Sequence, residues 1–289
     1  MAAVALGGAA LVAGPAAALA QPAAPAQTVV VGCSTASLVS AINTANTSVT
    51  ATTLQLSSNC TYTLFAPAAP GDGLPKIIKD ITLAGGLNTV IRRSSGASFR
   101  LLDVATTGNL TVIKVSLLNG NSTGPGGGIR DAGSLAVTNS TISGNRASDG
   151  GGVDVATGGS ATITSTLVNL NTTTNVGGGA VIAFGFVRLV NSVLDHNTAP
   201  SNGGGLNVQP AGNAVLQQTT VTNNTSGGFG GGIINLGRLS LSGSQVRLNQ
   251  GSNGGGIYTS NTNVTLTSTI IKKNTPNNCA PITISGCVN

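Results

Sequence analysis

The sequence has very little charge and almost no aromatic residues. Of its 289 residues only 7% are charged and 2% are aromatic, and there is no Trp. Glu is absent, so all seven acids are Asp, and His196 is the single His. This short inventory of ionisable groups narrows the acid–base chemistry that the chain can support. Nucleic-acid binding is not predicted, because surfaces of that kind interleave basic residues with aromatic side chains on which bases stack.

Low charge does not make the chain disordered, because 40% of its residues are hydrophobic and most of these are aliphatic. The glycines cluster in widely spaced triplets rather than at every third position, which excludes collagen. So much Gly, Asn, Thr and Ser disfavours helical bundles and coiled coils. The net charge of +6 comes from 13 basic and 7 acidic residues. A basic balance can indicate anionic partners, but here it reflects scarce acids.

The N-terminus resembles a secretory leader. Residues 1–20 are uncharged, apolar and rich in Ala, and they end in the cleavage pattern Ala18-Leu19-Ala20. We predict a signal peptide at 1–20, a linker at 21–32 and a secreted or cell-surface location. The usual basic start is missing, which leaves open a true start upstream of Met1. No later stretch approaches the ~20 apolar residues of a membrane span, so none is predicted in the mature chain.

Four cysteines suit an exported chain, and they lie in two groups, one near each end. Pairing of neighbours predicts the disulfides Cys33–Cys60 and Cys279–Cys287, although three connectivities are formally allowed. The run from Val30 to Cys33 also resembles a lipobox, but residues 21–27 separate it from the apolar stretch. No CxxC pair or Cys/His cluster is present, so no metal site is predicted.

The dominant feature is an internal repeat. Six Gly triplets start 24, 27, 26, 27 and 24 residues apart, and an Asn precedes each by a few residues. Short runs with alternating apolar and polar residues, such as 135–138 and 239–242, lie between these markers and indicate strands. The triplets are Gly126–Gly128, Gly150–Gly152, Gly177–Gly179, Gly203–Gly205, Gly230–Gly232 and Gly254–Gly256. The Asn markers are Asn121, Asn145, Asn171, Asn197, Asn224, Asn249 and a closing Asn274.

A period of ~25 residues with short strands and no helix predicts a β-solenoid. We predict an all-β fold, a right-handed parallel β-helix with a short N-terminal capping helix. Triplet glycines should stack at one corner, and the repeated Asn side chains should form a hydrogen-bonded ladder along the axis. Eight or so coils spaced ~4.8 Å apart would make a rod on the order of 40 Å long.

The repeat also predicts domain boundaries. An N-terminal cap at 33–66 contains residues 37–47, whose apolar positions have helical spacing. The parallel β-helix follows at 67–275, with regular coils from about Ile77 to Asn274. A C-terminal disulfide cap at 276–289 contains Pro276 and Pro281, which should stop strand pairing. Capped ends prevent end-to-end aggregation of open sheet edges.

The GGG[ILVA] and SxIxxN elements resemble the repeats of Pmp-type polymorphic outer-membrane proteins and the parallel β-helix proteins of the pectin-lyase superfold. The run from Cys33 through Asn59-Cys60-Thr61 to Gly71-Asp72-Gly73 resembles the start of exported bacterial β-helix proteins of unassigned function. This resemblance covers most of residues 33–289. It implies the fold, but it leaves activity open, since the superfold hosts lyases, hydrolases, adhesins and structural proteins.

One group of ionisable residues is a candidate catalytic site. Alignment on the triplets places Asp149 and Asp154 on either side of one triplet and puts Arg130 in the same column as Asp154. One interpretation is an Arg130–Asp154 ion pair between coils. The other is an acidic site of Asp131, Asp149 and Asp154, with Arg130 and Arg146 binding an anionic sugar. Glycoside hydrolysis requires two carboxylates roughly 5 to 9.5 Å apart.

Two further groups are weaker candidates. Asp195 and His196 occupy a position that differs from coil to coil, which indicates an outer corner. The basic residues Lys76, Lys79, Arg92, Arg93 and Arg100 gather near the early coils, with Asp72, Asp80 and Asp103 nearby. These residues are a candidate anion-binding patch.

Two functions follow from the sequence. The first is an exported, non-catalytic β-helix for surface interaction, adhesion or structure, with cell-surface or extracellular polysaccharide as the candidate partner. The alternative is a polysaccharide lyase or glycoside hydrolase that acts on an anionic polysaccharide. No cofactor is expected, except Ca²⁺ if the chain is a lyase. Ligand identity, anchoring to the envelope and oligomeric state are left open.

Overall fold

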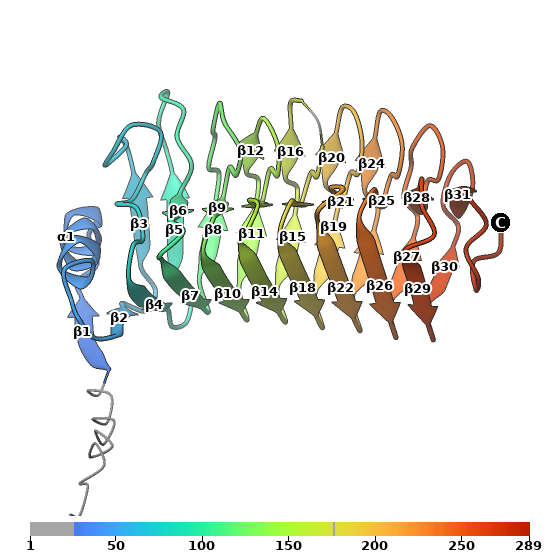
Figure 1. Cartoon of the computed structure of the whole chain (residues 1–289). Coiled ribbons are helices and arrows are strands. Elements are labelled where there is room, and N and C mark those ends of the chain that lie inside the picture. The colour runs from blue at the N-terminus through green and yellow to red at the C-terminus, as the bar shows by residue number, and fades with distance from the viewer. Residues whose placement is uncertain (1–25, 176) are drawn as a thin grey trace, which may run out of the picture.

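The chain winds into a parallel β-solenoid. The computed structural model describes residues 26–175 and 177–289, and within them the largest sheet contains ten strands, one from each turn. The turns stack into a rod with the first described residues and the C-terminus at opposite ends (Figure 1). Ten parallel strands spaced ~4.8 Å apart give a rod of about 45 Å. The predicted all-β parallel β-helix is confirmed, with more turns than the sequence suggested.

Four sheets run along the rod, and two of them contain most of the strands. Sheet A consists of β1 (Gln27–Val31), β2 (Thr52–Leu56), β4 (Asp80–Ala84), β7 (Asn109–Ile113), β10 (Ser134–Thr138), β14 (Ser160–Thr164), β18 (Phe186–Val190), β22 (Asn213–Gln217), β26 (Arg238–Ser242) and β29 (Val264–Thr267). Sheet B consists of β3 (Thr61–Leu64), β5 (Val90–Arg93), β8 (Ser116–Leu118), β11 (Thr141–Ser143), β15 (Leu167–Asn169), β19 (Val193–Asp195), β23 (Thr220–Thr222), β27 (Gln245–Arg247) and β30 (Ile270–Lys272).

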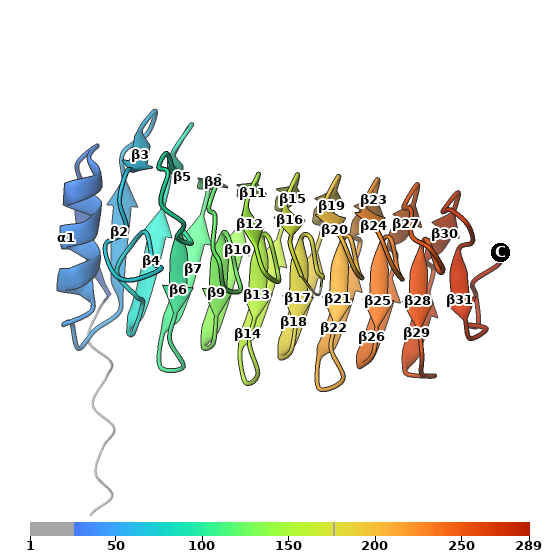
Figure 2. The same ribbon diagram turned by 90° about the horizontal axis from the view of Figure 1, so that it is seen from above.

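The other two sheets form the remaining sides of the solenoid, and one of them runs along only four coils. Sheet C is short and consists of β12 (Arg146–Ala147), β16 (Thr172–Thr173), β20 (Thr198–Ala199) and β24 (Thr225–Ser226). Sheet D consists of β6 (Leu102–Val104), β9 (Ile129–Asp131), β13 (Val153–Val155), β17 (Val181–Ala183), β21 (Leu206–Val208), β25 (Ile233–Asn235), β28 (Ile257–Thr259) and β31 (Cys279–Pro281). Figure 2 shows the coils side by side along the axis.

A single coil shows how the alternating pattern builds the core. The chain passes through β9, β10, β11 and β12 and returns through a Gly triplet to β13. In β10, Leu135 and Val137 point inward and are at most 2% exposed, while their neighbours face out. One coil later they pair with Ala161 and Ile163. Each inward column is therefore a continuous stack of aliphatic side chains, which is the core of the rod.

The predicted Asn ladder lines the corner between sheets B and C. The Nδ2 of Asn145 donates to Oδ1 of Asn171 at 3.0 Å, and the backbone N–H of Asn145 donates to the same oxygen at 3.0 Å. This double contact repeats from coil to coil as far as Asn274. Asn121 is not part of the ladder, because Gly120 occupies the equivalent position and donates its N–H to Asn145.

The Gly triplets stack at the corner that leads into sheet D, as predicted. In the triplet that starts at Gly150 (φ +56°), a Cβ on Gly151 would lie 2.6 Å from the carbonyl oxygens of Gly179 and Thr172. No side chain fits at that distance from backbone. Gly is therefore required at the centre of this triplet because neighbouring coils approach each other through their main chains.

The N-terminal end differs from the sequence prediction in one respect. Residues 21–32 were predicted to be a linker, but Gln27–Val31 form β1 and pair with β2. The β-branched run of three valines favours a strand here, and no Gly triplet marks it. The helix α1 (Thr35–Ala45) lies at this end of the rod, begins after the N-cap Ser34 and buries Leu38 and Ile42. The predicted signal peptide at 1–20 lies outside the described residues.

Both predicted disulfides are present. Cys33 and Cys60 join the start of α1 to β3, with their Cα atoms 5.7 Å apart, and Cys279 and Cys287 close a loop at the other end. Strand pairing continues further than expected at this end, because β31 contains Pro281 and pairs with β28. Among the described residues, no helix is both long enough and apolar enough to cross a membrane.

Candidate functional site

The candidate site lies on the outer face of sheet D. The middle residue of each three-residue strand points away from the core, whereas its two neighbours point into it. These middle residues stack in one column: Asp103, Arg130, Asp154, Ile182, Asn207, Ile234, Tyr258 and Ala280. The Gly-triplet loops cover the column, since a Cβ on Gly150 would lie 2.7 Å from Ile182. Side chains that would otherwise be on the surface are therefore buried.

Asp103 is the centre of an ion network in the first part of this column. Its carboxylate is 1% exposed and lies 2.8 Å from Nζ of Lys76. The guanidinium of Arg130 approaches it to 3.3 Å and that of Arg100 to 3.8 Å. Three cations thus share one buried carboxylate, which offsets the cost of removing that charge from water.

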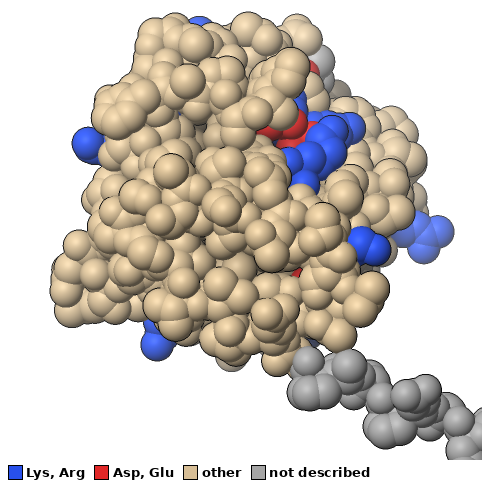
Figure 3. Space-filling model, turned by 90° about the vertical axis from the view of Figure 1, so that its left-hand side faces the viewer, with Lys and Arg blue, Asp and Glu red and all other residues tan. Residues whose placement is uncertain are grey.

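Arg100 and Arg130 connect Asp103 to two further carboxylates. Arg100 contacts Oδ1 of Asp72 at 2.6 Å, and Nε of Arg130 lies 3.9 Å from Oδ2 of Asp154. Burial and the nearby Asp103 raise the pKa of Asp72, and Arg100 lowers it by less. In the view onto the N-terminal end of the rod, basic and acidic atoms meet in one patch (Figure 3).

A pocket of about 280 Å³ opens beside this network. It brings together three of the five predicted site residues, Arg130, Asp149 and Asp154, and Phe184 forms part of its wall. Burial raises the pKa of Asp154 to about 7; Arg130 opposes this rise and Asp149 adds to it. At neutral pH the Asp154 carboxyl is therefore protonated in part of the molecules and ionised in the rest. Arg130 lies nearer to Asp103, at 3.3 Å, than to Asp154, at 3.9 Å. A carboxyl of this kind can donate a proton as well as accept one.

The structure separates the other two predicted residues from the pocket. Asp131 occupies the inward column between Val104 and Val155 and is fully buried. It accepts the N–H of Gly133 at 3.0 Å, and its Oδ2 has no hydrogen-bond partner among the described residues. Burial raises its pKa to about 6. Arg146 lies exposed on β12 in sheet C, outside the pocket. Asp131 and Arg146 therefore do not join Asp149 and Asp154 in one site.

The two weaker candidate groups, the Asp195–His196 pair and the early basic residues, lie in different surroundings. His196 has φ +51° and lies at the outer corner after β19, where its Nδ1 is 2.8 Å from Oδ2 of Asp195. Asn223 also donates to Asp195, at 2.8 Å. In the basic group near the early coils, Lys76 and Arg100 belong to the ion network described above. Lys79 and Arg92 are exposed.

The connection between the early basic group and Arg130 is the feature that the sequence interpretation missed. Asp103 aligns with Arg130 through the pairing of β6 and β9, but β6 precedes the first Gly triplet. The run Leu101-Leu102-Asp103-Val104 is a detectable signal, because it repeats the apolar–charged–apolar pattern of Val153-Asp154-Val155.

The residues present do not favour a resident metal. Within the described residues, no group of three or more His, Cys or Asp side chains is placed to hold a metal ion. Asp103 and Asp72 are instead contacted by Lys and Arg side chains.

Comparison with family models, with curated proteins and with solved structures finds no match to this chain. The likeness to Pmp-type repeats and to the pectin-lyase superfold therefore rests on the repeat pattern itself.

Proposed function

We propose that the chain is an exported, non-catalytic β-helix that binds anionic polysaccharide at the cell surface or outside the cell. The observation that carries this proposal is the unequal exposure of the two kinds of charge. Among the acids only Asp80 is exposed, and four are buried. Nine of the 13 basic residues are exposed: Lys76, Lys79, Arg92, Lys114, Arg146, Arg188, Arg238, Lys272 and Lys273.

The surface is therefore more basic than the net charge suggests. Asp72, Asp103, Asp131 and Asp154 are at most 4% exposed, and three of them lie in or beside the ion network. The exposed cations are spread over several sheets, with Arg188 in sheet A and Arg146 in sheet C. Such a surface supports many weak contacts along a flexible polyanion, each sensitive to ionic strength.

Export is supported by the cysteines. All four cysteines form disulfides, as expected of a chain that matures in an oxidising compartment. The C-terminal end of sheet B carries a group of three cations, since Arg247 pairs in register with Lys272, and Lys273 follows directly. Like charges in adjacent strands repel each other. A polyanion lying across this group would relieve that repulsion.

Binding of the purified, disulfide-bonded chain to a polyuronate and to a neutral glucan tests the proposal. We expect binding to the polyuronate alone, with affinity that decreases as salt is added. Changing Arg247, Lys272 and Lys273 together to Gln should weaken it severalfold. Changing Thr198 and Thr225, which are exposed and neutral, to Gln provides the matched control. Equal binding of the two polymers, or binding insensitive to salt, contradicts the proposal.

A second candidate function rests on the pocket beside Asp154. A carboxyl with a pKa of about 7 can act as general acid while Asp149 acts as base, and Arg130 can hold a sugar carboxylate. This arrangement supports a hydrolase or lyase acting on anionic polysaccharide. Assays for reducing ends and unsaturated products across a glycan panel test it. Activity lost in Asp154→Asn and Asp149→Asn but kept in Asp80→Asn supports the enzyme, whereas absence of products from every glycan argues for the non-catalytic function.

A further inference from the structure

The two ends of sheet A are protected to very different degrees. Within the described residues β1 is the edge strand at the N-terminal end, and Val30 on it is 80% exposed. Natural edge strands usually contain charged residues, Pro or a bulge, or they are covered by another segment, which prevents pairing with a second chain. The sequence of β1, QTVVV, has neither charge nor Pro. It is a β-branched, uncharged edge that is suited to pairing.

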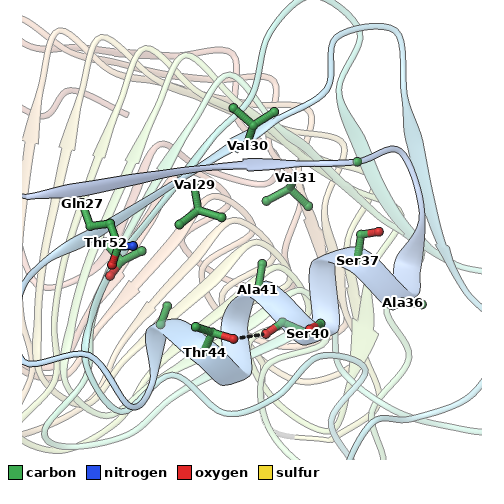
Figure 4. Close-up of a pocket in the computed structure, with 12 residues that line it drawn as sticks. Gln27, Val29, Val30, Val31, Ala36, Ser37, Ser40, Ala41, Thr44 and Thr52 are labelled. Atoms are coloured by element: carbon green, nitrogen blue, oxygen red, sulfur yellow. Dashed lines mark hydrogen bonds between the residues drawn. The ribbon is translucent and has the colours of Figure 1, made fainter.

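Neither β1 nor α1 carries a charged side chain, since the first charged residue of the chain is Asp72. A groove of about 540 Å³ lies between β1 and α1. Val29 and Val31 point into it toward Ala41 of α1, while Val30 points away (Figure 4). The exposed residues of α1 are small and neutral: Ala36, Ser40, Asn43 and Thr44.

The C-terminal end contrasts with this. β29 is the last strand of sheet A, and the chain that follows it contains Lys272 and Lys273 and then the loop closed by Cys279–Cys287. Ile284, within that loop, is 5% exposed and packs against the core. Charge and a covalently closed loop therefore protect this end. The N-terminal end also has a disulfide-closed loop, Cys33–Cys60, but the edge strand β1 itself carries no charge.

The backbone of β1 leaves a symmetric set of hydrogen-bonding groups on its outer edge. Gln27 donates its N–H to the carbonyl of Ala51 at 2.9 Å, so Gln27, Val29 and Val31 direct their main-chain groups toward β2. Thr28 and Val30 alternate with them and direct theirs outward. These two residues lie one on each side of Val29, the middle residue of the strand.

We propose that this edge pairs two copies of the chain, with β1 of one copy antiparallel to β1 of the other about a twofold axis at Val29. In that register Thr28 of each copy exchanges hydrogen bonds with Val30 of the other, and the two Val29 residues face each other without them. The two copies would form one continuous sheet across the axis. The proposal concerns a different surface from the polysaccharide-binding function and does not depend on it.

A second copy is the occupant that the observations favour. Two chains of charge +6 repel each other, and pairing through β1 brings together strands that carry no charge of their own. The outward N–H and C=O groups of one β1 can pair with those of a second β1 about a twofold axis. Pairing with an unrelated peptide would not require this symmetry. The segment just before β1 is a poor alternative, because Pro22 and Pro25 lack the N–H that a pairing strand donates.

Sedimentation of the full chain over a range of concentrations, combined with one charged variant, tests the proposal. We expect a monomer–dimer equilibrium in which Val30→Lys weakens association by about tenfold or more, equivalent to about 1.4 kcal/mol or more. Leu87→Lys introduces the same charge at another exposed apolar residue away from β1 and serves as the matched control. A chain that is monomeric throughout, or a dimer that tolerates Val30→Lys as well as Leu87→Lys, overturns the proposal.

Crosslinking then tests the register. Facing residues in a non-hydrogen-bonded antiparallel pair have Cβ atoms about 4.5–5.5 Å apart, so Val29→Cys should form a disulfide-linked dimer under mild oxidation. Gln27→Cys provides the control, because the two Gln27 residues would be four residues out of register, about 13 Å apart. Equal crosslinking of the two variants, or none at Val29→Cys, overturns the twofold arrangement.

Discussion

The two halves of sheet D have the same backbone but different side chains on its outer face. In the N-terminal half the outward column holds Asp103, Arg130 and Asp154, and in the C-terminal half it continues with Ile182, Asn207 and Ile234. All except Arg130 are at most 3% exposed. Strand length and register are the same in both halves, although β6 precedes the first Gly triplet. The outward column therefore does not specify the fold, which is determined by the inward columns and the Asn ladder.

The two halves differ in how their contributions to stability respond to pH and salt. Buried apolar side chains contribute through removal of surface from water, which is insensitive to pH. Buried carboxylates contribute through protonation and pairing, which change with pH and salt. We therefore expect the N-terminal half to determine how the stability of the protein varies with pH.

The largest expected effect concerns pH and Asp154. Burial raises its pKa to about 7 from 3.8, so between these values the folded protein binds a proton that the unfolded chain releases. The free energy of unfolding should therefore decrease as pH rises from about 4 to about 7 and then level off. Each unit of pKa difference is worth about 1.4 kcal/mol, so the decrease should total a few kcal/mol. Asp131, with a pKa raised to about 6, adds to it with the same sign.

Denaturant titrations of Asp154→Asn across this range measure the effect. The variant cannot release that proton, so its stability should vary less with pH than that of the parent protein. Asp80→Asn, which changes an exposed carboxylate, serves as the matched control. An Asp154→Asn profile as steep as the parent profile would show that the buried carboxyl is not responsible.

The disulfides provide the next comparison, between the two ends of the rod. Cys33–Cys60 spans 27 residues and Cys279–Cys287 spans 8. Loop-closure entropy predicts that replacing the first pair with Ser costs about 3.5 kcal/mol and replacing the second costs about 2.5 kcal/mol. Thermal unfolding of the two double variants would measure this order. A larger loss of stability on replacing the C-terminal pair would contradict the loop-closure account, because it would mean that this disulfide also stabilises the folded state directly.

Removing one side chain from each half of the column should give unequal costs. Asp103→Ala deprives Lys76, Arg100 and Arg130 of their shared carboxylate and should cost about 3 kcal/mol. Asn207→Ala loses one hydrogen bond with Gln209 and should cost about 1 kcal/mol. Urea titrations at neutral pH would compare them. Equal losses of stability in the two variants would show that the ion network does not make the N-terminal half of the column different from the C-terminal half.

The smallest expected difference between the halves is in the stability lost when an Asn of the ladder is replaced, because both halves share the ladder. Asn145→Ala in the N-terminal half and Asn224→Ala in the C-terminal half each remove buried hydrogen bonds to two neighbouring coils. Both should cost about 2 kcal/mol, and the two values should agree within about 0.5 kcal/mol if ladder and ion network are independent. A distinctly larger loss at Asn145 would show that the ladder and the ion network are coupled.

The regular coils were predictable because two markers repeat together. Gly triplets and Asn residues fix the register of successive coils, and this alignment correctly placed Arg130 beside Asp154. The same alignment puts Asp131 level with Val155, an inward position, so its separation from the pocket was also detectable. Burial of the column under the Gly loops could not be foreseen, since it depends on how closely those loops pack.

The irregular start of the rod was harder to predict. β1 has no Gly triplet or ladder Asn to align it, and Ala and Pro precede it, so it resembled a linker. Asp72 and Arg100 are 28 residues apart and meet through an isolated parallel bridge between two early coils. Pairings of this kind depend on tertiary structure that a periodic pattern does not contain.

The Asn ladder also defines the unit by which this chain can gain or lose length. Asn145 and Asn171 occupy equivalent positions in successive coils, and each binds the next Asn in the same way. Excision of residues 145–170 would join Gly144 to Asn171 and rebuild the same corner one coil shorter. Duplication of that stretch would lengthen the rod by one coil. Nearest-neighbour stacking makes such changes local, so gene rearrangement can vary the length of the molecule while its cross-section stays constant.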